Sequence, residues 1–270
     1  MSDGIVGRIK SSPSNFNCML DNYQEKGRRS GRGNRAPTMP EVHYPEIRAL
    51  NLFAGMQEAH FQALMRGAYV QNFPPQIDLI SEGEPSDFLH VLISGSVDLF
   101  ARWNGRETSL ATVRPISSFI LAATIRNSPY LMSARTLEKS RIILIPSQDV
   151  RGIFDVDGEF ARAVVSELAQ CYRSVVKSQK DLKLRTSLER LANYVLRQQK
   201  RAGGAASFDL DHEKRRLASV LGMTPENLSR AFKGLQPYGV TVEGARITIR
   251  DQPDLERFAR PNPLIDDHAT

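Results

Sequence analysis

The stretch LASVLGMTPENLSRAFKGL (residues 217–235) restricts the fold of this chain more than any other segment. Gly222 suits the left-handed turn that ends one helix, and Thr224 can cap the N-terminus of the next. Pro225 at the first helical position costs no hydrogen bond. Two helices joined by so short a turn cannot lie parallel, so the segment predicts a helix-turn-helix unit. The second helix of such a unit enters the major groove of DNA by its N-terminal end.

The second helix separates an apolar stripe from a polar face. The stripe recurs at spacings of three and four: Leu228, Phe232 and Leu235. The predicted DNA-contacting residues are Glu226, Ser229, Arg230, Thr224, Asn227 and Lys233. Arginine can donate two hydrogen bonds to guanine, glutamate can accept from the cytosine amino group, and serine can bond a base or a phosphate. The alternative is an exposed, charged helix pair in an interaction domain.

The segment after this helix supports a nucleic-acid partner. The sequence VTVEGARITI (residues 240–249) predicts two short strands, the wing of a winged helix near the sugar-phosphate backbone. Residues 181–250 contain 13 Lys and Arg and 7 Asp and Glu, an excess that equals the net charge of +6 of the whole chain. A local basic excess is typical of a nucleic-acid footprint.

The N-terminal half predicts a β domain. After a short amphipathic helix (MQEAHFQALMRGA, residues 56–68), short β-like segments are broken by Gly, Pro and Asn. FLHVLISGSVDLFARW (residues 88–103) turns at Gly95, and Asn104-Gly105 is a strong type I′ hairpin signal. TSLATV and RTLEKSRIILIP continue the pattern. Many short strands without long helices between them indicate a jelly-roll-like β-roll.

A long helix is predicted from residue 157 to about 184. Its stripe is longer than a small β domain can cover, which favours packing against a second copy of itself over one long helix lying across its own core. The predicted dimer interface is Phe160, Val164, Leu168, Cys171, Val175 and Leu182. Cys171 is interpreted as packing in this interface. The sequence TSLE (residues 186–189) fits a capping box that begins the next helix.

The predicted fold class is α+β, with a β-roll, a long dimerisation helix and a winged helix-turn-helix domain. The predicted parts are a disordered basic N-terminal extension over residues 1–42, a β-roll effector domain over 43–155, the dimerisation helix over 156–184, the DNA-binding domain over 185–252 and a C-terminal tail over 253–270. No apolar run of membrane-spanning length and no signal-peptide core is present, so we expect a cytoplasmic protein without a membrane partner. Cys18 and Cys171, the only two cysteines, are then expected to be reduced.

The order of these parts resembles the CRP/FNR family of bacterial transcription regulators over roughly residues 44–250. EGEPSDFLHVLISGSVDLF in the β-roll and LASVLGMTPENLSRAFKGL carry the resemblance. It implies a homodimer on double-stranded DNA, with RNA polymerase as a further partner. Glu226, Ser229 and Arg230 match the FNR-like Glu-x-x-Ser-Arg pattern, which implies half-sites like TTGAT in an inverted repeat.

The sensor end departs from the best-known members of the family. Only Cys18 precedes the roll, so one chain cannot build the four-thiolate iron–sulfur cluster of oxygen-sensing relatives. Cyclic-nucleotide binders of the family carry a Gly-Glu pair and an Arg-Ser pair. In PISSFILAATIRNSPYLMSART (residues 115–136) we interpret Leu121-Ala122 and Tyr130-Leu131 as their replacements, so cyclic AMP is not expected. Arg126 and Arg135 flank the region without a following Ser.

The same segment resembles the DNR/NNR-type branch, which implies a response to nitric oxide or low oxygen and suggests haem as a cofactor. No axial ligand is assigned to His43, His60 or His90. The rival functions are a cyclic-nucleotide-responsive regulator and a cupin-like metal enzyme. The enzyme would need clustered His and carboxylate ligands, and only His90 lies in the roll strands, so we expect no catalytic or metal site.

Overall fold

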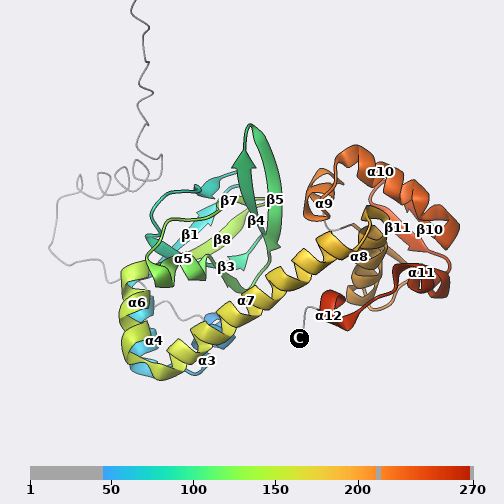
Figure 1. Cartoon of the computed structure of the whole chain (residues 1–270). Coiled ribbons are helices and arrows are strands. Elements are labelled where there is room, and N and C mark those ends of the chain that lie inside the picture. The colour runs from blue at the N-terminus through green and yellow to red at the C-terminus, as the bar shows by residue number, and fades with distance from the viewer. Residues whose placement is uncertain (1–44, 211–213, 268–270) are drawn as a thin grey trace, which may run out of the picture. The chain divides into compact units, whose positions relative to one another are not determined.

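The computed structural model describes residues 45–210 and 214–267 (Figure 1). The predicted N-terminal extension, with Cys18, lies outside the described residues, and so does His43. Within the described ranges, no helix is long and apolar enough to cross a membrane.

Eight strands form the predicted β-roll as two four-stranded antiparallel sheets (Figure 1). The strand orders are β1-β8-β3-β6 and β2-β7-β4-β5. The strands are β1 (Tyr69–Phe73), β2 (Asp78–Ile80), β3 (Phe88–Ser94), β4 (Val97–Trp103), β5 (Arg106–Val113), β6 (Ser117–Phe119), β7 (Ser133–Thr136) and β8 (Ser140–Pro146). The sequence predicted β3, β4, β5 and the β7–β8 region, but not the short strands β1, β2 and β6.

Two turns of the roll match their sequence signals. Asn104 and Gly105 have φ values of 48° and 72°, and a type I′ turn needs positive φ at both central positions. Gly95, between β3 and β4, has φ 90°, and an added Cβ would lie 2.6 Å from the carbonyl oxygen of Lys139. Only glycine fits that turn without displacing the neighbouring backbone.

A group of helices shares an apolar core with one face of the first sheet. These helices are α2 (Pro45–Arg48), α3 (Asn51–Ala54), α4 (Glu58–Gly67), α5 (Leu121–Arg126), α6 (Ser147–Val156) and the first turns of α7 (Gly158–Leu184). Phe53 lies near the centre, stacked on Phe160 with the ring centroids 6.1 Å apart. Leu89 and Val91, two residues apart in β3, supply the sheet side because alternate residues of a strand point to the same face.

Asp157 fixes the start of α7. Its carboxylate accepts hydrogen bonds from the backbone N–H groups of Glu159 and Phe160, both at 3.1 Å, and contacts His60 Nδ1 at 2.8 Å. Burial alone would raise the pKa of Asp157, but hydrogen bonds from Phe160, His60 and the backbone of Gln57 outweigh burial and lower it to about 2. The carboxylate is therefore ionised at neutral pH.

The C-terminal part begins with α8 (Ser187–Arg201), where Thr186 and Glu189 form the predicted capping box. It continues with β9 (Ser207–Asp209), α9 (Lys214–Val220), α10 (Pro225–Gly234), the 3-10 helix η1 (Gln236–Tyr238), β10 (Val240–Glu243), β11 (Arg246–Ile249), α11 (Gln252–Ala259) and α12 (Pro263–Asp266). The strands form one sheet of order β10-β11-β9. This confirms the winged helix-turn-helix and adds β9, which the sequence reading missed.

The tail predicted over residues 253–270 is wrong for its described part. Residues 252–259 and 263–266 form α11 and α12. Leu255 and Ala259 belong to the core of the C-terminal domain, and Ile265 is also buried. Helix α11 therefore belongs to the folded domain rather than to an extension from it.

Candidate nucleic-acid interface

The turn between α9 and α10 has the geometry that the sequence predicted. Gly222 has φ 62°, and its N–H donates to the carbonyl of Ser219 at 2.9 Å. Thr224 caps α10 through its hydroxyl, which accepts from the N–H of Asn227 at 3.2 Å. Pro225 occupies the first turn of α10. The turn thus redirects the chain without leaving the first N–H groups of α10 unpaired.

A buried arginine that the sequence analysis missed holds this turn. Arg190, on α8, donates from Nε to the carbonyl of Leu221 at 2.9 Å and from Nη1 to that of Arg185 at 2.7 Å. A guanidinium that is 8% exposed needs such acceptors to offset the loss of its hydration. No signal in the sequence distinguishes Arg190 from the other arginines of the basic segment.

Helix α10 is anchored by its apolar stripe and leaves its polar face open. Leu228, Phe232 and Leu235 are all buried in the core of the C-terminal domain, as predicted. The predicted DNA-contacting residues are all exposed: Glu226, Ser229, Arg230, Thr224, Asn227 and Lys233. The structure therefore brings this set together on the free face of one helix.

The exposed face combines an ionised acceptor with a cationic donor. The pKa of Glu226 is lowered, first by a hydrogen bond to its own N–H, then by the Thr224 hydroxyl and by the positive charge of Arg230. The hydroxyl of Ser229 donates to the carbonyl of Pro225 at 3.0 Å. At neutral pH the face thus presents a carboxylate, a hydroxyl and a guanidinium near the N-terminus of α10. These groups can recognise base edges in a groove.

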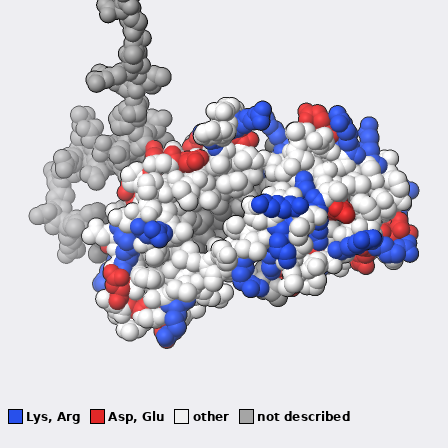
Figure 2. All heavy atoms as spheres, viewed as in Figure 1, with Lys and Arg blue, Asp and Glu red and all other residues white. Residues whose placement is uncertain are grey.

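The wing and the surrounding surface add basic side chains. The strands β10 and β11 meet at Gly244, which has φ 62°, and Arg246 and Arg250 are exposed at the ends of β11. Figure 2 shows Lys and Arg side chains over the C-terminal part of the chain, with a smaller number of acidic side chains among them. This distribution agrees with the basic excess of residues 181–250.

Helix α7 carries an apolar stripe, but the structure corrects its composition. Phe160 and Val164 are fully buried in the core beside the roll, so they cannot contact a second copy, and their assignment to the dimer interface is wrong. Leu168 is half-buried and packs against the same core. Cys171, Val175 and Leu182 are exposed. The sequence reading missed four further large apolar residues of α7 that are exposed: Val165, Tyr172, Val176 and Leu184.

The segment between β6 and β7 is filled by apolar side chains. Leu121, at the start of α5, and Tyr130 are each 5% exposed, and the Tyr130 hydroxyl donates to the carbonyl of Phe88 at 3.4 Å. Ile120 has φ 65°, an unusual conformation for a β-branched residue, which shows that this position favours glycine sterically. Leu131 is 83% exposed, and its side chain has no polar group that could bind a ligand.

The two arginines of this region serve other contacts or face solvent. Arg126, in the last turn of α5, is exposed. Arg135 donates from Nε to Asp78 at 2.6 Å and from Nη1 to Glu107 at 3.2 Å, and its guanidinium lies 4.5 Å from the centroid of the Phe100 ring. Its charge is thus already paired with two carboxylates.

The two described histidines, His60 and His90, both have contacts within the chain. His60 is bonded to Asp157. His90 is 4% exposed, with its ring centroid 5.1 Å from that of Phe119. Burial lowers the pKa of His90 to about 4, although a hydrogen bond to the backbone of Phe88 opposes the shift. Among the described residues no group of three or more His, Cys, Asp or Glu could hold a metal ion.

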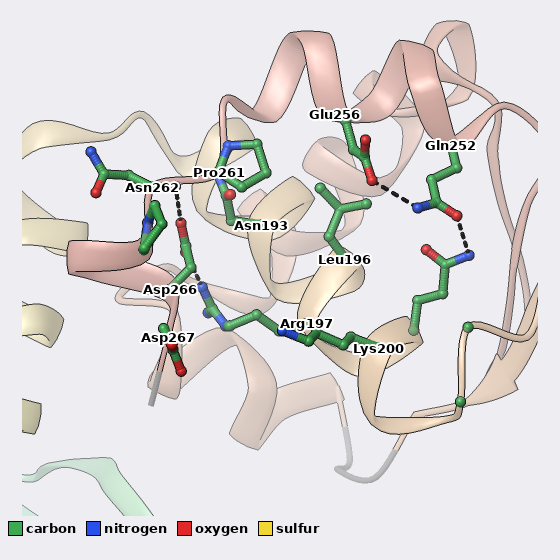
Figure 3. Close-up of a pocket in the computed structure, with 14 residues that line it drawn as sticks. Asn193, Leu196, Arg197, Lys200, Gln252, Glu256, Pro261, Asn262, Asp266 and Asp267 are labelled. Atoms are coloured by element: carbon green, nitrogen blue, oxygen red, sulfur yellow. Dashed lines mark hydrogen bonds and ion pairs between the residues drawn. The ribbon is translucent and has the colours of Figure 1, made fainter. Parts of the chain in front are cut away.

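A cavity of about 560 Å³ lies away from the DNA-contacting face, among α8, α11 and the segment around α12 (Figure 3). Residues with polar side chains are frequent in its lining, among them Asn193, Arg197, Lys200, Gln252 and Glu256. Figure 3 shows Gln252 linked to Glu256, and Arg197 to Asp266. Neither His60 nor His90 borders this cavity.

Comparison with known proteins matches both halves of the chain. The family described as "Cyclic nucleotide-binding domain" matches residues 70–157, and "Crp-like helix-turn-helix domain" matches residues 189–258. A "CRP-like cAMP-activated global transcriptional regulator" of Mycobacterium tuberculosis is 26% identical over 215 residues, covering 77% of this chain and 96% of the relative.

Solved structures share the fold. FixK2 from Bradyrhizobium japonicum has a TM-score of 0.60 and 21% identity, over 70% of this chain and 96% of its own. A structure described within the crp/fnr family, from Eubacterium rectale, has a TM-score of 0.63 and 18% identity, over 78% of this chain and 98% of its own. At these identities the likeness concerns the fold.

Proposed function

Because this chain belongs to the CRP/FNR family of DNA-binding transcription regulators, we propose that it acts as a homodimer that reads an FNR-like inverted repeat. The observation that carries the proposal is the exposed face of α10, where Glu226, Ser229 and Arg230 lie above a fully anchored apolar stripe. Its site of action would be the cytoplasm, with RNA polymerase as a partner and without catalytic activity.

Each of the three side chains has a distinct proposed role at a half-site. Arg230 donates two hydrogen bonds to the O6 and N7 atoms of guanine, and Glu226 accepts from the amino group of a cytosine. Ser229 bonds a base or a phosphate. Thr224, Asn227 and Lys233 border these residues and contact the backbone or neighbouring bases. This division predicts base discrimination from the first two residues and general affinity from Lys233.

The proposed dimer forms through the exposed stripe of α7. Its members are Val165, Cys171, Tyr172, Val175, Val176 and Leu182. Several large apolar side chains exposed on one helix mark a surface that a partner covers. A second copy of α7 would cover this surface. The resulting dimer would have the two-fold symmetry that an inverted repeat requires.

For the signal we propose nitric oxide or low oxygen. Support comes from the buried side chains of Leu121 and Tyr130, neither of which carries a charge that could bind a cyclic phosphate. The second candidate is a cyclic nucleotide, favoured by the family match over residues 70–157. Haem is not assigned a ligand in either case.

Selection of bound sites from random DNA tests the central proposal. Purified full-length protein should enrich two TTGAT-like half-sites in inverted orientation. Enrichment of a single half-site would argue against the dimer, and enrichment of an unrelated sequence would refute the FNR-like reading. Absorption spectra recorded without oxygen, before and after adding haem and then nitric oxide, test the proposed signal separately.

A further inference from the structure

The last described segment of the chain, Asn262–Asp267, has a defined conformation, and we name it the C-terminal strap. The side chain of Asn262 accepts from the N–H of Leu264 at 2.8 Å, and the N–H of Asn262 donates to Asp266 Oδ2 at 2.7 Å. Ile265 is buried. The strap is therefore a capped turn fixed at both ends, and its Asp266 side chain is held in place by its own backbone.

Asp266 joins two arginines, Arg185 between α7 and α8 and Arg197 on α8. The guanidinium of Arg185 donates to both carboxylate oxygens of Asp266, at 2.7 and 2.6 Å. Arg197, on α8, donates to Oδ1 at 2.7 Å, a contact that Figure 3 shows. The side chains of Arg185 and Asp266 are only 8% and 11% exposed. Charge-assisted, bidentate bonds with so little solvent access are stronger than surface ion pairs.

The strap also contacts α7 further from its end. Lys177 Nζ donates to the carbonyl of Asp267, and Lys180 Nζ donates to the carbonyl of Leu264 at 3.3 Å. Lys177 is 5% exposed although it lies on a helix whose opposite side is open to solvent. Together with the Asp266 pairs, these contacts connect the last two turns of α7 to the middle of α8.

Arg185 lies at the junction between α7 and α8, so the contacts of the strap with Arg185 affect how these two helices are oriented. Arg185 follows the last residue of α7 and has φ −115° and ψ 144°, so the two long helices meet at a non-helical residue. Helix α8 packs against α10, so the angle at Arg185 determines how α10 is carried relative to α7. A junction of this kind is a potential hinge, because changes in φ and ψ at a few non-helical residues can reorient one helix relative to the other.

We propose that the C-terminal strap locks the junction between α7 and α8. The strap thereby sets the orientation of the DNA-reading helix α10 relative to α7. The ionic state supports this role. Burial would raise the pKa of Asp266, but its hydrogen bonds from Arg185 and Asn262 and the charges of Arg185 and Arg197 lower it. Asp266 is thus charged at neutral pH and holds both arginines.

Amide hydrogen exchange of the full-length protein tests the lock. Asp266→Asn removes the charge and keeps the shape, and a chain ending at Pro261 removes the whole strap. Asp254→Asn is the matched control, because the Asp254 carboxylate pairs with Arg257 of the same helix, α11, at 2.8 Å. We expect peptides covering residues 178–190 to exchange about tenfold faster or more in both strap variants, and unchanged in the control.

Unchanged exchange of residues 178–190 in both strap variants would overturn the proposal. An increase spread evenly over the C-terminal domain would also overturn it, because it would mean that the strap only stabilises the fold. The consequence for DNA reading rests on the proposed function, but the exchange result does not. If the wild-type protein bound no inverted repeat, the proposed function would fail while the lock could still be measured.

Discussion

At the scale of single residues, Arg230 offers the sharpest test of DNA reading. Arg230→Ala should remove roughly 1–3 kcal/mol of discrimination per half-site at one guanine, because alanine cannot make the bidentate bond. Competition binding with the wild-type site, a site altered at that guanine and random DNA measures the loss. Arg257→Ala, an exposed arginine of α11, is the control and should keep full discrimination. An equal loss of affinity for all three DNAs would show that Arg230 contacts phosphate only.

His90 predicts a specific dependence of stability on pH. Its pKa is about 4 in the folded protein, below the usual value of 6.5, because its ring is buried. As the pH falls below about 6.5, His90 binds a proton in the unfolded chain but not in the folded protein, so the free energy of unfolding decreases. The loss should reach about 3 kcal/mol near pH 4.

His90→Leu separates this effect from all other titrations. The variant has no imidazole, so its stability relative to the wild type should rise by about 3 kcal/mol between pH 7 and pH 4. Urea unfolding at several pH values gives the difference directly. A difference that is independent of pH would mean that His90 is accessible to protons in the folded protein.

At the scale of elements, the exposed stripe of α7 predicts how the protein assembles. Val175 is 58% exposed, so Val175→Glu should leave the fold intact and place a charge on each side of the proposed dimer interface. Burying two like charges without partners is unfavourable, so sedimentation should show monomers, and DNA binding should weaken with assembly. Ser166→Glu is the control, because Ser166 is exposed and lies about 180° around the helix from Val175, so the variant adds the same charge on the opposite side. A Val175→Glu protein that stays dimeric would place the interface elsewhere.

Elements with strong local signals were predictable from the sequence. The Asn104-Gly105 hairpin, the capping box at Thr186 and the start of α10 at Thr224 each depend on a few adjacent residues. The strand β6 and the strand β9, each three residues long, gave no recognisable period and depend on pairing with distant strands. Helix α11 was missed for a similar reason, because its role comes from Leu255 reaching a core built by other elements.

The residues of the candidate site also differ in whether the sequence alone could predict them. The exposed set on α10 follows from helical spacing alone, so it could be placed without the structure. The apolar stripe of α7 could not be assigned correctly, because periodicity shows which residues share a face but not which partner covers them. Phe160 and Val164 share that stripe, yet Phe53 and its neighbours cover them within the same chain. Arg190 and Asp266 act across elements, and nothing local in the sequence indicates this.

At the scale of the whole molecule, the sensor segment predicts that cyclic nucleotides do not control this regulator. A buried cyclic phosphate needs a cation, since burial of an unpaired charge costs several kcal/mol. Leu121 and Tyr130 fill the segment, and the Tyr130 hydroxyl is directed to the carbonyl of Phe88. Arg135 is held by Asp78 and Glu107, and recruiting it would break both pairs.

Calorimetric titration of the full-length protein with cyclic AMP and with cyclic GMP measures this directly, and we expect no heat of binding at micromolar ligand. The same titration on protein carrying Arg135→Lys should look identical, because Arg135 is already paired with Asp78 and Glu107. Saturable binding that tightens the complex with the inverted repeat would contradict the prediction and restore the cyclic-nucleotide alternative. In that case the segment would have to rearrange at Ile120, whose φ of 65° is strained for a β-branched residue. A change of this φ to a negative value would relieve the strain.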